Sequence, residues 1–177
     1  GELKSAPEVK YRSILDYDTP IEWINTEGME CNEEFVGESF GRINKEEAAL
    51  SISQLTNYIN KIGKDRFLEE RIDVGVISPY KAQVQYLRQL IKRDAFFKPY
   101  RHLITINTVD GFQGQERDVI LISLVRANEE GQIGFLNDLR RMNVAITRAR
   151  MKLIILGDAS TLTKHPFYKK LYEYILA

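Results

Sequence analysis

Two arginines end the stretch NVAITRAR, residues 143–150, directly before the apolar run that begins at Met151. The guanidinium group of arginine is a planar fork of donors that matches the oxygens of a phosphate. Arg141 and Arg148 are seven residues apart, so a continuous helix would place them on one face, about 10 Å from each other. Cations are also favoured at a helix C-terminus by the helix dipole alone. The local pattern therefore fits phosphate binding and simple helix stabilisation equally well.

A second polar segment, TVDGFQGQERD (residues 108–118), lies between two apolar runs. Gly111 and Gly114 are three residues apart and allow backbone amides to turn toward a ligand. Asp110-Gly111 alone is ordinary turn chemistry. A turn does not explain why the same short segment also holds Gln113 and Glu116. We therefore interpret the segment as a ligand-binding loop.

A third segment, SPYKAQ (residues 78–83), follows the apolar run DVGVI. Pro79 suits the first turn of a helix. Tyr80 is expected to be partly exposed, where its ring could stack on a nucleic-acid base. Gln83 follows one helical turn further on.

The elements that would position these segments alternate between strands and helices. Runs rich in apolar and β-branched residues predict strands over 21–27, 73–78, 103–109, 118–125 and 152–157. Helical spacing of apolar residues predicts helices over 44–62, 80–93, 136–149 and 165–176. This alternation predicts an α/β fold, with a mostly parallel sheet covered by helices on both faces. Ligands of such sheets bind beyond the carboxyl ends of the strands, so we expect the site there.

The first helix has the clearest boundaries. Asn44 and Glu47 have the spacing of a capping box, and Gly63 is expected to end the helix. Its apolar positions, at spacings of three and four, form one buried stripe: Ala48, Ile52, Leu55, Ile59 and Ile62. The preceding segment 28–42 has no period and predicts a loop, whose acidic part from Glu30 to Glu38 is expected to be solvated.

One connection stays open from the sequence. Only ten residues, 108–117, separate two predicted strands, which is near the lower limit for a parallel crossover. A single helical turn could make that crossover, or the two strands could form an antiparallel hairpin.

Composition limits the class of protein. The chain has 177 residues, which fits one domain, and its 25 basic and 25 acidic residues give no net charge. A strongly basic nucleic-acid binder is not indicated, although a local basic groove is compatible with zero net charge. The single cysteine, Cys31, excludes an internal disulfide, and the lack of a Cys/His cluster argues against structural zinc. No apolar run is long enough to span a membrane and no secretory signal is evident, so we expect a cytoplasmic setting without membrane partners.

Together, the three segments resemble the second, C-terminal RecA-like domain of superfamily 1 helicases, on the branch of the nonsense-mediated-decay RNA helicase and its relatives. IDVGVISPYKAQVQYL is similar to the motif IV region of that family, ITINTVDGFQGQERDVILISLVRAN to motif V, and LRRMNVAITRARMKLIILGD to motif VI. NKEEA (residues 44–48) also resembles the branch's pattern before its first long helix. The resemblance covers about residues 40–160, and Asn143 favours this branch over the other large one, which usually has Tyr at that position.

The resemblance implies roles for individual residues. Arg148 matches the arginine finger that reaches the γ-phosphate of ATP, and Glu116 matches the motif V glutamate near the ribose. Gln113 and Gly114 match the loop that senses the phosphate and links it to nucleic acid. Positions on the nucleic-acid side of the domain are matched by Ser78, Tyr80 and Thr108. Arg150 is expected to support the helix end, and the strands around residue 110 are expected to be parallel.

Several family elements are missing from this sequence. It contains no G-x-x-x-x-G-K-[ST] phosphate loop, no apolar strand ending in Asp-Glu, and no Gln-Tyr-Arg segment before the domain. Phosphoryl transfer needs the phosphate loop and Mg²⁺ as well as the finger. The chain is therefore expected to be one domain over 1–177, with a core of about 20–177, from a longer helicase, and to be inactive alone. No resident metal site is expected.

The expected partners follow from the same resemblance. An N-terminal RecA-like domain of the same polypeptide would hold ATP and Mg²⁺, and single-stranded DNA or RNA would lie across both domains. Two other classes remain open. The chain could be a non-catalytic nucleic-acid- or protein-binding module on a degenerate RecA-like fold. It could also be a free-standing nucleotide-binding enzyme, although it lacks a phosphate cradle.

Overall fold

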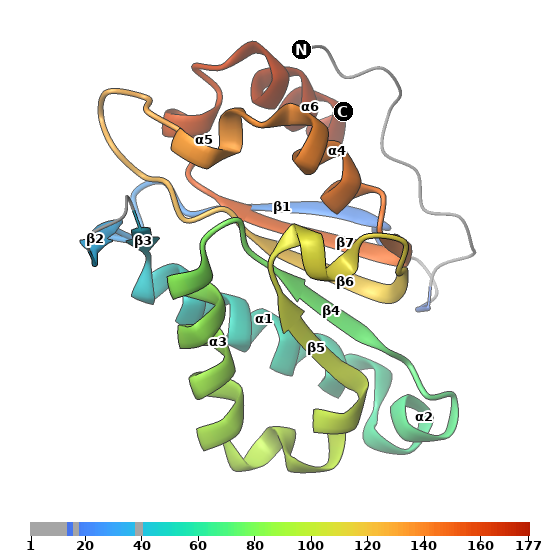
Figure 1. Cartoon of the computed structure of the whole chain (residues 1–177). Helices are drawn as coiled ribbons and strands as arrows, with labels where there is room; N and C mark the ends of the chain where they lie inside the picture. The colour runs from blue at the N-terminus through green and yellow to red at the C-terminus, as the bar shows by residue number, and fades with distance from the viewer. Residues whose placement is uncertain (1–13, 16–17, 38–40) are drawn as a thin grey trace.

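A five-stranded parallel sheet forms the centre of the protein (Figure 1). The computed structural model describes residues 14–15, 18–37 and 41–177. The strand order is β1-β7-β6-β4-β5, and every neighbouring pair in it is parallel. The strands are β1 (Ile21–Asn25), β4 (Val74–Ile77), β5 (Ile104–Asn107), β6 (Arg117–Ser123) and β7 (Ala149–Gly157). The predicted α/β fold with a mostly parallel sheet is confirmed.

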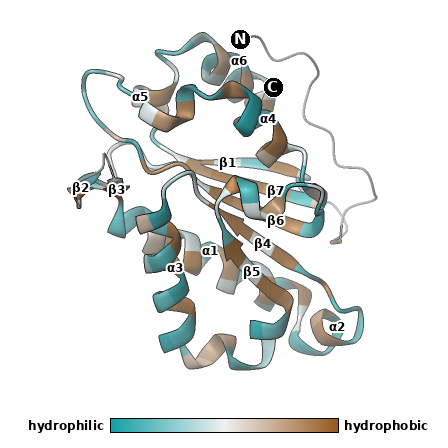
Figure 2. Ribbon diagram, in the orientation of Figure 1, coloured by the Kyte–Doolittle hydropathy of each residue, from teal (hydrophilic) through white to brown (hydrophobic). Residues whose placement is uncertain are grey.

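Helices cover both faces of the sheet, which makes three layers. One face packs against α1 (Lys45–Ile62), α2 (Lys64–Glu69), α3 (Lys81–Arg93) and the 3₁₀ segment η1 (Ala95–Leu103). The other face packs against the 3₁₀ turns η2 (Val109–Phe112) and η3 (Gly134–Asn137) and the helices α4 (Leu139–Ile146), α5 (Ala159–Leu162) and α6 (Pro166–Leu176). The central strands are apolar over most of their length, with charged residues near the starts of β6 and β7, and polar residues lie on the outer helices (Figure 2). Strands buried on both faces are near-continuous apolar runs for this reason.

The first long helix confirms its predicted boundaries. Asn44 caps α1 by accepting a hydrogen bond from the backbone N–H of Glu47 at 3.0 Å, and Gly63 ends the helix at a φ of 91°. The predicted apolar stripe is buried throughout. The predicted return hydrogen bond of the capping box, from the Asn44 backbone N–H to the Glu47 side chain, is wrong. The Glu47 side chain accepts from Ser123 Oγ and Val125 N instead. The backbone N–H of Asn44 donates to Gln83 Oε1.

The short connection between β5 and β6 is a crossover. The two strands are not neighbours, because β4 lies between them and pairs in parallel with both. A single 3₁₀ turn, η2, covers the distance, and its Phe112 packs over the middle of β4. A Cβ at Gly75 would lie 2.7 Å from the Phe112 ring, so glycine is what allows this close approach. The parallel alternative is therefore correct.

The segment 28–42 contains regular structure that the sequence did not predict. Two short strands, β2 (Glu34–Val36) and β3 (Gly41–Ile43), pair antiparallel as a small separate sheet. Glycines and acids without a period had suggested a loop. The pairing escapes prediction because each strand has only three residues.

The helix before β7 is shorter than predicted. Helix α4 ends at Ile146, Thr147 is its C-cap, and β7 begins at Ala149. Arg148 therefore follows the helix instead of sharing a helical face with Arg141, which corrects that prediction. Over the described ranges, none of the helices has the length and apolar character needed to cross a membrane.

Candidate functional site

The predicted site residues divide between the two ends of the parallel strands. Thr108 follows the carboxyl end of β5, whereas Glu116 and Arg148 directly precede β6 and β7. The backbone N–H of Arg117 donates to the carbonyl of Arg148 at 3.0 Å, which brings Glu116 and Arg148 onto adjacent strand starts. The expectation that all of these residues gather at the carboxyl ends is wrong. Loop 108–116 runs from one end of the sheet to the other and joins the two groups.

Arg148 lies at the junction of α4 and β7 with its side chain partly exposed. Its Nε donates to the Val144 carbonyl at 3.1 Å, and its Nη2 donates to Thr147 Oγ1 at 3.3 Å. Both acceptors belong to the end of α4, where carbonyls have no partner within the helix. Among the described residues, no carboxylate forms an ion pair with Arg148. The guanidinium therefore keeps donors for an external anion.

The end of loop 108–116 is open beside these strand starts. Gln113 and Gly114 are exposed. Gly114 has a φ of 73°, and a Cβ there would meet nothing within 4 Å. Glycine is therefore favoured at this position by the backbone conformation of the turn and not by a close contact. Glu116 is partly exposed one residue before β6. We name Gln113, Gly114, Glu116 and Arg148 the amino-end region.

Arg150 differs from Arg148 although it is only two residues away. It lies in β7, where its Nη2 contacts Asp73 Oδ1 at 2.9 Å and its Nε contacts Asp118 Oδ1 at 3.0 Å. Asp73 and Asp118 also accept from each other's backbone N–H groups. The expected support of the helix end is wrong: Arg150 ties together the starts of β4, β6 and β7.

A groove lies at the carboxyl ends of β4 and β5. Its volume is about 490 Å³, and its lining residues include Pro79, Tyr80, Lys81, Ala82, Thr108, Asp110, Phe135 and Arg141. Arg141 Nη2 contacts Asp110 Oδ2 at 2.5 Å, with the Arg141 side chain about half exposed and the Asp110 side chain largely exposed. Helix α3 begins here with no side-chain cap and no acidic residue in its first turn. The positive end of a helix dipole favours an anion at such a place.

Ser78 and Tyr80 are more buried than predicted. Ser78 is 0% exposed and Tyr80 is 2% exposed, so the expected partly exposed Tyr80 ring is wrong. The Tyr80 hydroxyl accepts from Arg126 Nη1 at 3.2 Å, and the ring of Phe135 covers its ring at a centroid distance of 5.0 Å. Of the three predicted nucleic-acid positions, only Thr108 presents a side chain that is partly exposed in the groove.

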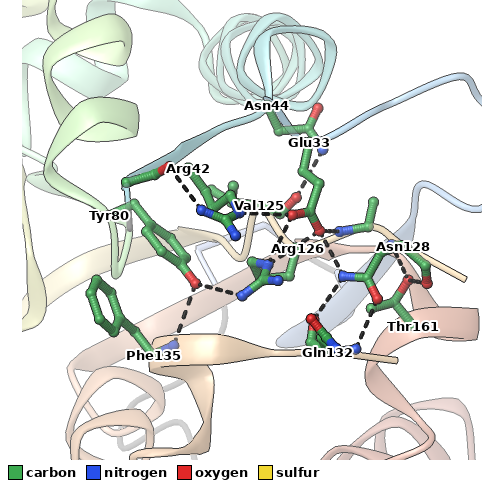
Figure 3. Close-up of polar contacts among 12 residues, drawn as sticks. Glu33, Arg42, Asn44, Tyr80, Val125, Arg126, Asn128, Gln132, Phe135 and Thr161 are labelled. Atoms are coloured by element: carbon green, nitrogen blue, oxygen red, sulfur yellow. Dashed lines mark hydrogen bonds and ion pairs between the residues drawn. The ribbon is translucent and has the colours of Figure 1, made fainter. Parts of the chain in front are cut away.

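A partly buried network of polar contacts centres on Glu33, and its Arg126 contacts Tyr80, which lines the groove (Figure 3). Glu33 accepts from Arg126 Nε at 3.1 Å, from Arg42 Nε at 3.1 Å, from the Ala127 N–H at 2.9 Å and from Asn128 Nδ2 at 2.7 Å. Burial by itself would raise the pKa of Glu33, but the hydrogen bonds and the charge of Arg126 lower it below its ordinary value. The expected solvated acidic stretch is therefore wrong at this residue. We name these five residues the Glu33 network.

The Glu33 network adjoins a second buried carboxylate. Glu47 is 0% exposed and accepts from Ser123 Oγ at 2.6 Å and from Val125 N at 2.8 Å. Burial raises the pKa of Glu47 to about 7 despite these hydrogen bonds, and the charge of Asp158 adds to the effect. Val125 has a φ of 71°, which is strained for a β-branched residue. Glu47 and Asn44 hold this strained backbone from both sides, since Asn44 Nδ2 donates to the Val125 carbonyl.

Neither Glu33 nor Arg126 was among the predicted site residues. The sequence offered one signal, the motif V similarity that runs on through LVRAN, but nothing in it connects Arg126 to an acid 93 residues away. Metal ligands do not gather either: across the ranges that the structure describes, no three His, Cys, Asp or Glu residues are placed to hold an ion.

Comparison with known proteins identifies the family. A family model described as an AAA domain matches residues 1–160. The probable helicase MAGATAMA 3 of Arabidopsis thaliana is 47% identical over 60% of this chain and 13% of its own length. The DNA replication ATP-dependent helicase/nuclease DNA2 of Mus musculus is 36% identical over 93% of this chain and 14% of its own length. The regulator of nonsense transcripts 1 homolog of Drosophila melanogaster is 36% identical over 89% of this chain and 13% of its own length.

The chain thus spans 13% to 14% of the length of these relatives. Among solved structures, the C-terminal domain of a possible DNA helicase from Lactobacillus plantarum aligns over 85% of this chain and 88% of its own, with a TM-score of 0.48 and 14% identity. The chain belongs to the AAA domain family and is a RecA-like helicase domain, on the superfamily 1 branch that its motifs indicated.

Proposed function

We propose that this domain is the second motor domain of an ATP-dependent helicase and supplies Arg148 as an arginine finger. An N-terminal RecA-like domain of a longer polypeptide would hold ATP and Mg²⁺, and this chain would close on it. The observation that carries the proposal is the contrast between two nearby arginines. Arg150 is held by two carboxylates, whereas the Arg148 side chain, among the residues that the structure describes, donates only to polar groups of the α4 end.

The expected chemistry of Arg148 is electrostatic. Phosphoryl transfer spreads negative charge over the transferred group, and a guanidinium placed there stabilises it. Arg148 would exchange its contacts with Val144 and Thr147 for phosphate oxygens without breaking an ion pair, so the switch costs little. Glu116 lies on the adjacent strand start, where it would contact the ribose. Gln113 and Gly114 would approach the phosphates from the same loop.

The nucleic-acid track would lie at the opposite end of the strands. Thr108 and Lys81 line the groove there and would contact the backbone of a single strand. Loop 108–116 would then connect strand binding to nucleotide binding through one short segment. Ser78 and Tyr80 would act beneath the track, since their side chains are buried. The relatives' names mention both DNA replication and transcripts, so the proposal commits to single-stranded nucleic acid as a class.

The test of the finger is Arg148→Ala in the complete helicase that contains this domain. An arginine finger contributes about 10³-fold to 10⁵-fold to turnover, so the rate of ATP hydrolysis should fall to a small residual value while ATP binding persists. Arg140→Ala is the matched control, because Arg140 is an exposed arginine of α4, the helix whose end Arg148 contacts. Turnover within a few-fold of the native rate in a folded Arg148→Ala variant would refute the assignment and favour the non-catalytic binding module.

A further inference from the structure

Phe135 is an exposed aromatic residue whose position is fixed by the residues packed beneath it. The residue is 50% exposed, and its ring stacks on the buried Tyr80 at a centroid distance of 5.0 Å and an interplanar angle of 24°. One ring face is therefore occupied by Tyr80. Leaving the other face of a phenylalanine ring in water is unfavourable.

Two hydrogen bonds fix the Tyr80 ring beneath Phe135, and a glycine allows η3 to approach it. The Tyr80 hydroxyl accepts from Arg126 Nη1 at 3.2 Å and from the backbone N–H of Phe135 at 3.4 Å (Figure 3). Gly134 has a φ of 52°, and a Cβ there would lie 2.2 Å from Arg126 Nη1 and 2.7 Å from the Tyr80 hydroxyl. Glycine is thus required for η3 to approach this pair. Arg126 is itself held by Glu33, so the aromatic stack rests on the Glu33 network.

The surroundings of Phe135 match a nucleic-acid strand. The ring lines the groove that also holds Lys81, Thr108 and the Arg141–Asp110 pair, and it lines a second hollow of about 480 Å³ with Arg42 and Arg126. Aromatic rings with cations and hydroxyl groups around them are the usual means of holding single strands, since every base has a π-face. Arg141, Arg42 and Arg126 are already paired with carboxylates, so the polar groups of the groove left for a partner are the Lys81 ammonium and the Thr108 hydroxyl, which a purely apolar partner would not match.

We infer that Phe135 is a stacking platform for a nucleobase of the bound single strand, with Tyr80 and Gly134 as positioning residues beneath it. This inference rests on the proposed nucleic-acid track and adds the residue that contacts a base. It also moves the stacking role from Tyr80, where the sequence had suggested it, to the ring that lies on top of Tyr80. Stacking contacts the face of a base and makes no hydrogen bonds to its edge, so this position should accept any base.

The first experiment compares strands with and without bases. Native chain and Phe135→Ala are titrated with a fluorescently labelled single-stranded oligonucleotide and with an abasic strand of equal length. Loss of one stacked base should weaken binding of the normal strand about 5-fold to 150-fold. Binding of the abasic strand, which has the same phosphates, should change less than about twofold. Phe135→Tyr should bind the normal strand like the native chain, and Phe135→Leu should bind it like Phe135→Ala.

The second experiment reads stacking directly. The native chain has one tryptophan, Trp23, which is 7% exposed and donates to the Gly157 carbonyl. Emission from Phe135→Trp above the native signal therefore reports position 135. The normal strand should quench that emission and the abasic strand should not. Thermal unfolding of each variant checks that the fold is kept, which is expected for a half-exposed side chain.

The outcomes separate this inference from the proposed function. Lys81→Ala should weaken both strands, because it removes a phosphate contact. If Lys81→Ala weakens binding while the Phe135 variants bind like the native chain, the platform is refuted and the track stands. Equal binding by Phe135→Leu and the native chain would also refute it, because an aliphatic side chain cannot stack. If the native chain binds neither strand, the track and the platform both fail.

Discussion

The amino-end region and the Glu33 network both present charged side chains near strand ends, yet their surroundings differ. In the Glu33 network, each charge is matched: the Arg126 side chain is 6% exposed and its carboxylate partner is 14% exposed. In the amino-end region, the Arg148 side chain donates to one backbone oxygen and one hydroxyl oxygen at the end of α4, and to no carboxylate in the described part of the chain. The difference teaches how to separate a charge that stabilises the fold from one that is kept available. A buried charge must be paired, whereas an available one needs solvent and weak contacts.

The largest stability effect should come from Glu33→Ala. Removal of the carboxylate leaves Arg126 buried without its ion-pair partner and frees the Asn128 and Ala127 donors. Breaking one side of a buried pair costs about 3–5 kcal/mol, so the free energy of unfolding in urea should fall by about 3 kcal/mol. Glu34→Ala is the control, because this neighbouring glutamate is exposed. Equal effects of the two variants would mean that the network does not stabilise the fold.

The next effect is a dependence on pH. Burial raises the pKa of Glu47 from 4.5 to about 7, so the folded protein holds a proton that the unfolded chain releases. Stability from this group is complete below pH 4.5 and is lost as the pH rises to about 7, by about 3 kcal/mol in all. Glu47→Gln cannot titrate. The free energy of unfolding of the native chain should therefore fall relative to Glu47→Gln between pH 5 and pH 7.

Two results would contradict this pH prediction. A constant difference between the native chain and Glu47→Gln across that range would place the Glu47 pKa outside it. A difference that grows in favour of the native chain as pH rises would mean that the carboxylate is stabilised by its hydrogen bonds from Ser123 and Val125 more than burial opposes it. Both native chain and variant keep the same surface carboxylates, so their titration cancels in the comparison.

A smaller effect is expected for Gly134→Ala, which tests how closely η3 approaches the Glu33 network. A left-handed backbone costs a residue with a Cβ roughly 1–2 kcal/mol. At Gly134 the added Cβ also meets Arg126 and Tyr80, whereas at Gly28, with a φ of 78°, it would meet nothing within 4 Å. Gly28→Ala should therefore cost about 1 kcal/mol and Gly134→Ala about 2–3 kcal/mol in urea unfolding. Equal costs would show that Arg126 moves aside freely.

The fold was largely predictable because its signals are local. The apolar stripe of α1, its Asn44 cap and the continuous apolar run of β6 each follow from the spacing of residues along a few turns or one strand. The order of the strands does not follow from such local signals, because β4 lies between β5 and β6. The length of the connection between β5 and β6 alone allowed two geometries. The family motifs favoured the parallel one, and that choice is confirmed.

The site was predicted less completely, because burial depends on partners that are distant in sequence. Tyr80 lies just beyond the end of β4, where site residues are expected, but Phe135, 55 residues away in the sequence, covers its ring. Glu33 lies among acids in a segment without a period, so nothing marks it as buried. Position after a strand therefore identified the correct segments, whereas the side chains that contact solvent depend on tertiary packing.

The smallest effect should be that of Arg148→Ala on stability, and it provides the sharpest test of the comparison. The two acceptors that Arg148 contacts, the Val144 carbonyl and Thr147 Oγ1, lie at a helix end where water can replace the guanidinium. The free energy of unfolding should therefore change by less than about 0.5 kcal/mol, as at ordinary surface positions. Arg150→Ala is the matched control, since it breaks two ion pairs, and should cost about 1–2 kcal/mol. If Arg148→Ala destabilised the chain as much as Arg150→Ala, Arg148 would be a structural residue, and any loss of turnover in the complete helicase could be explained by a weakened fold.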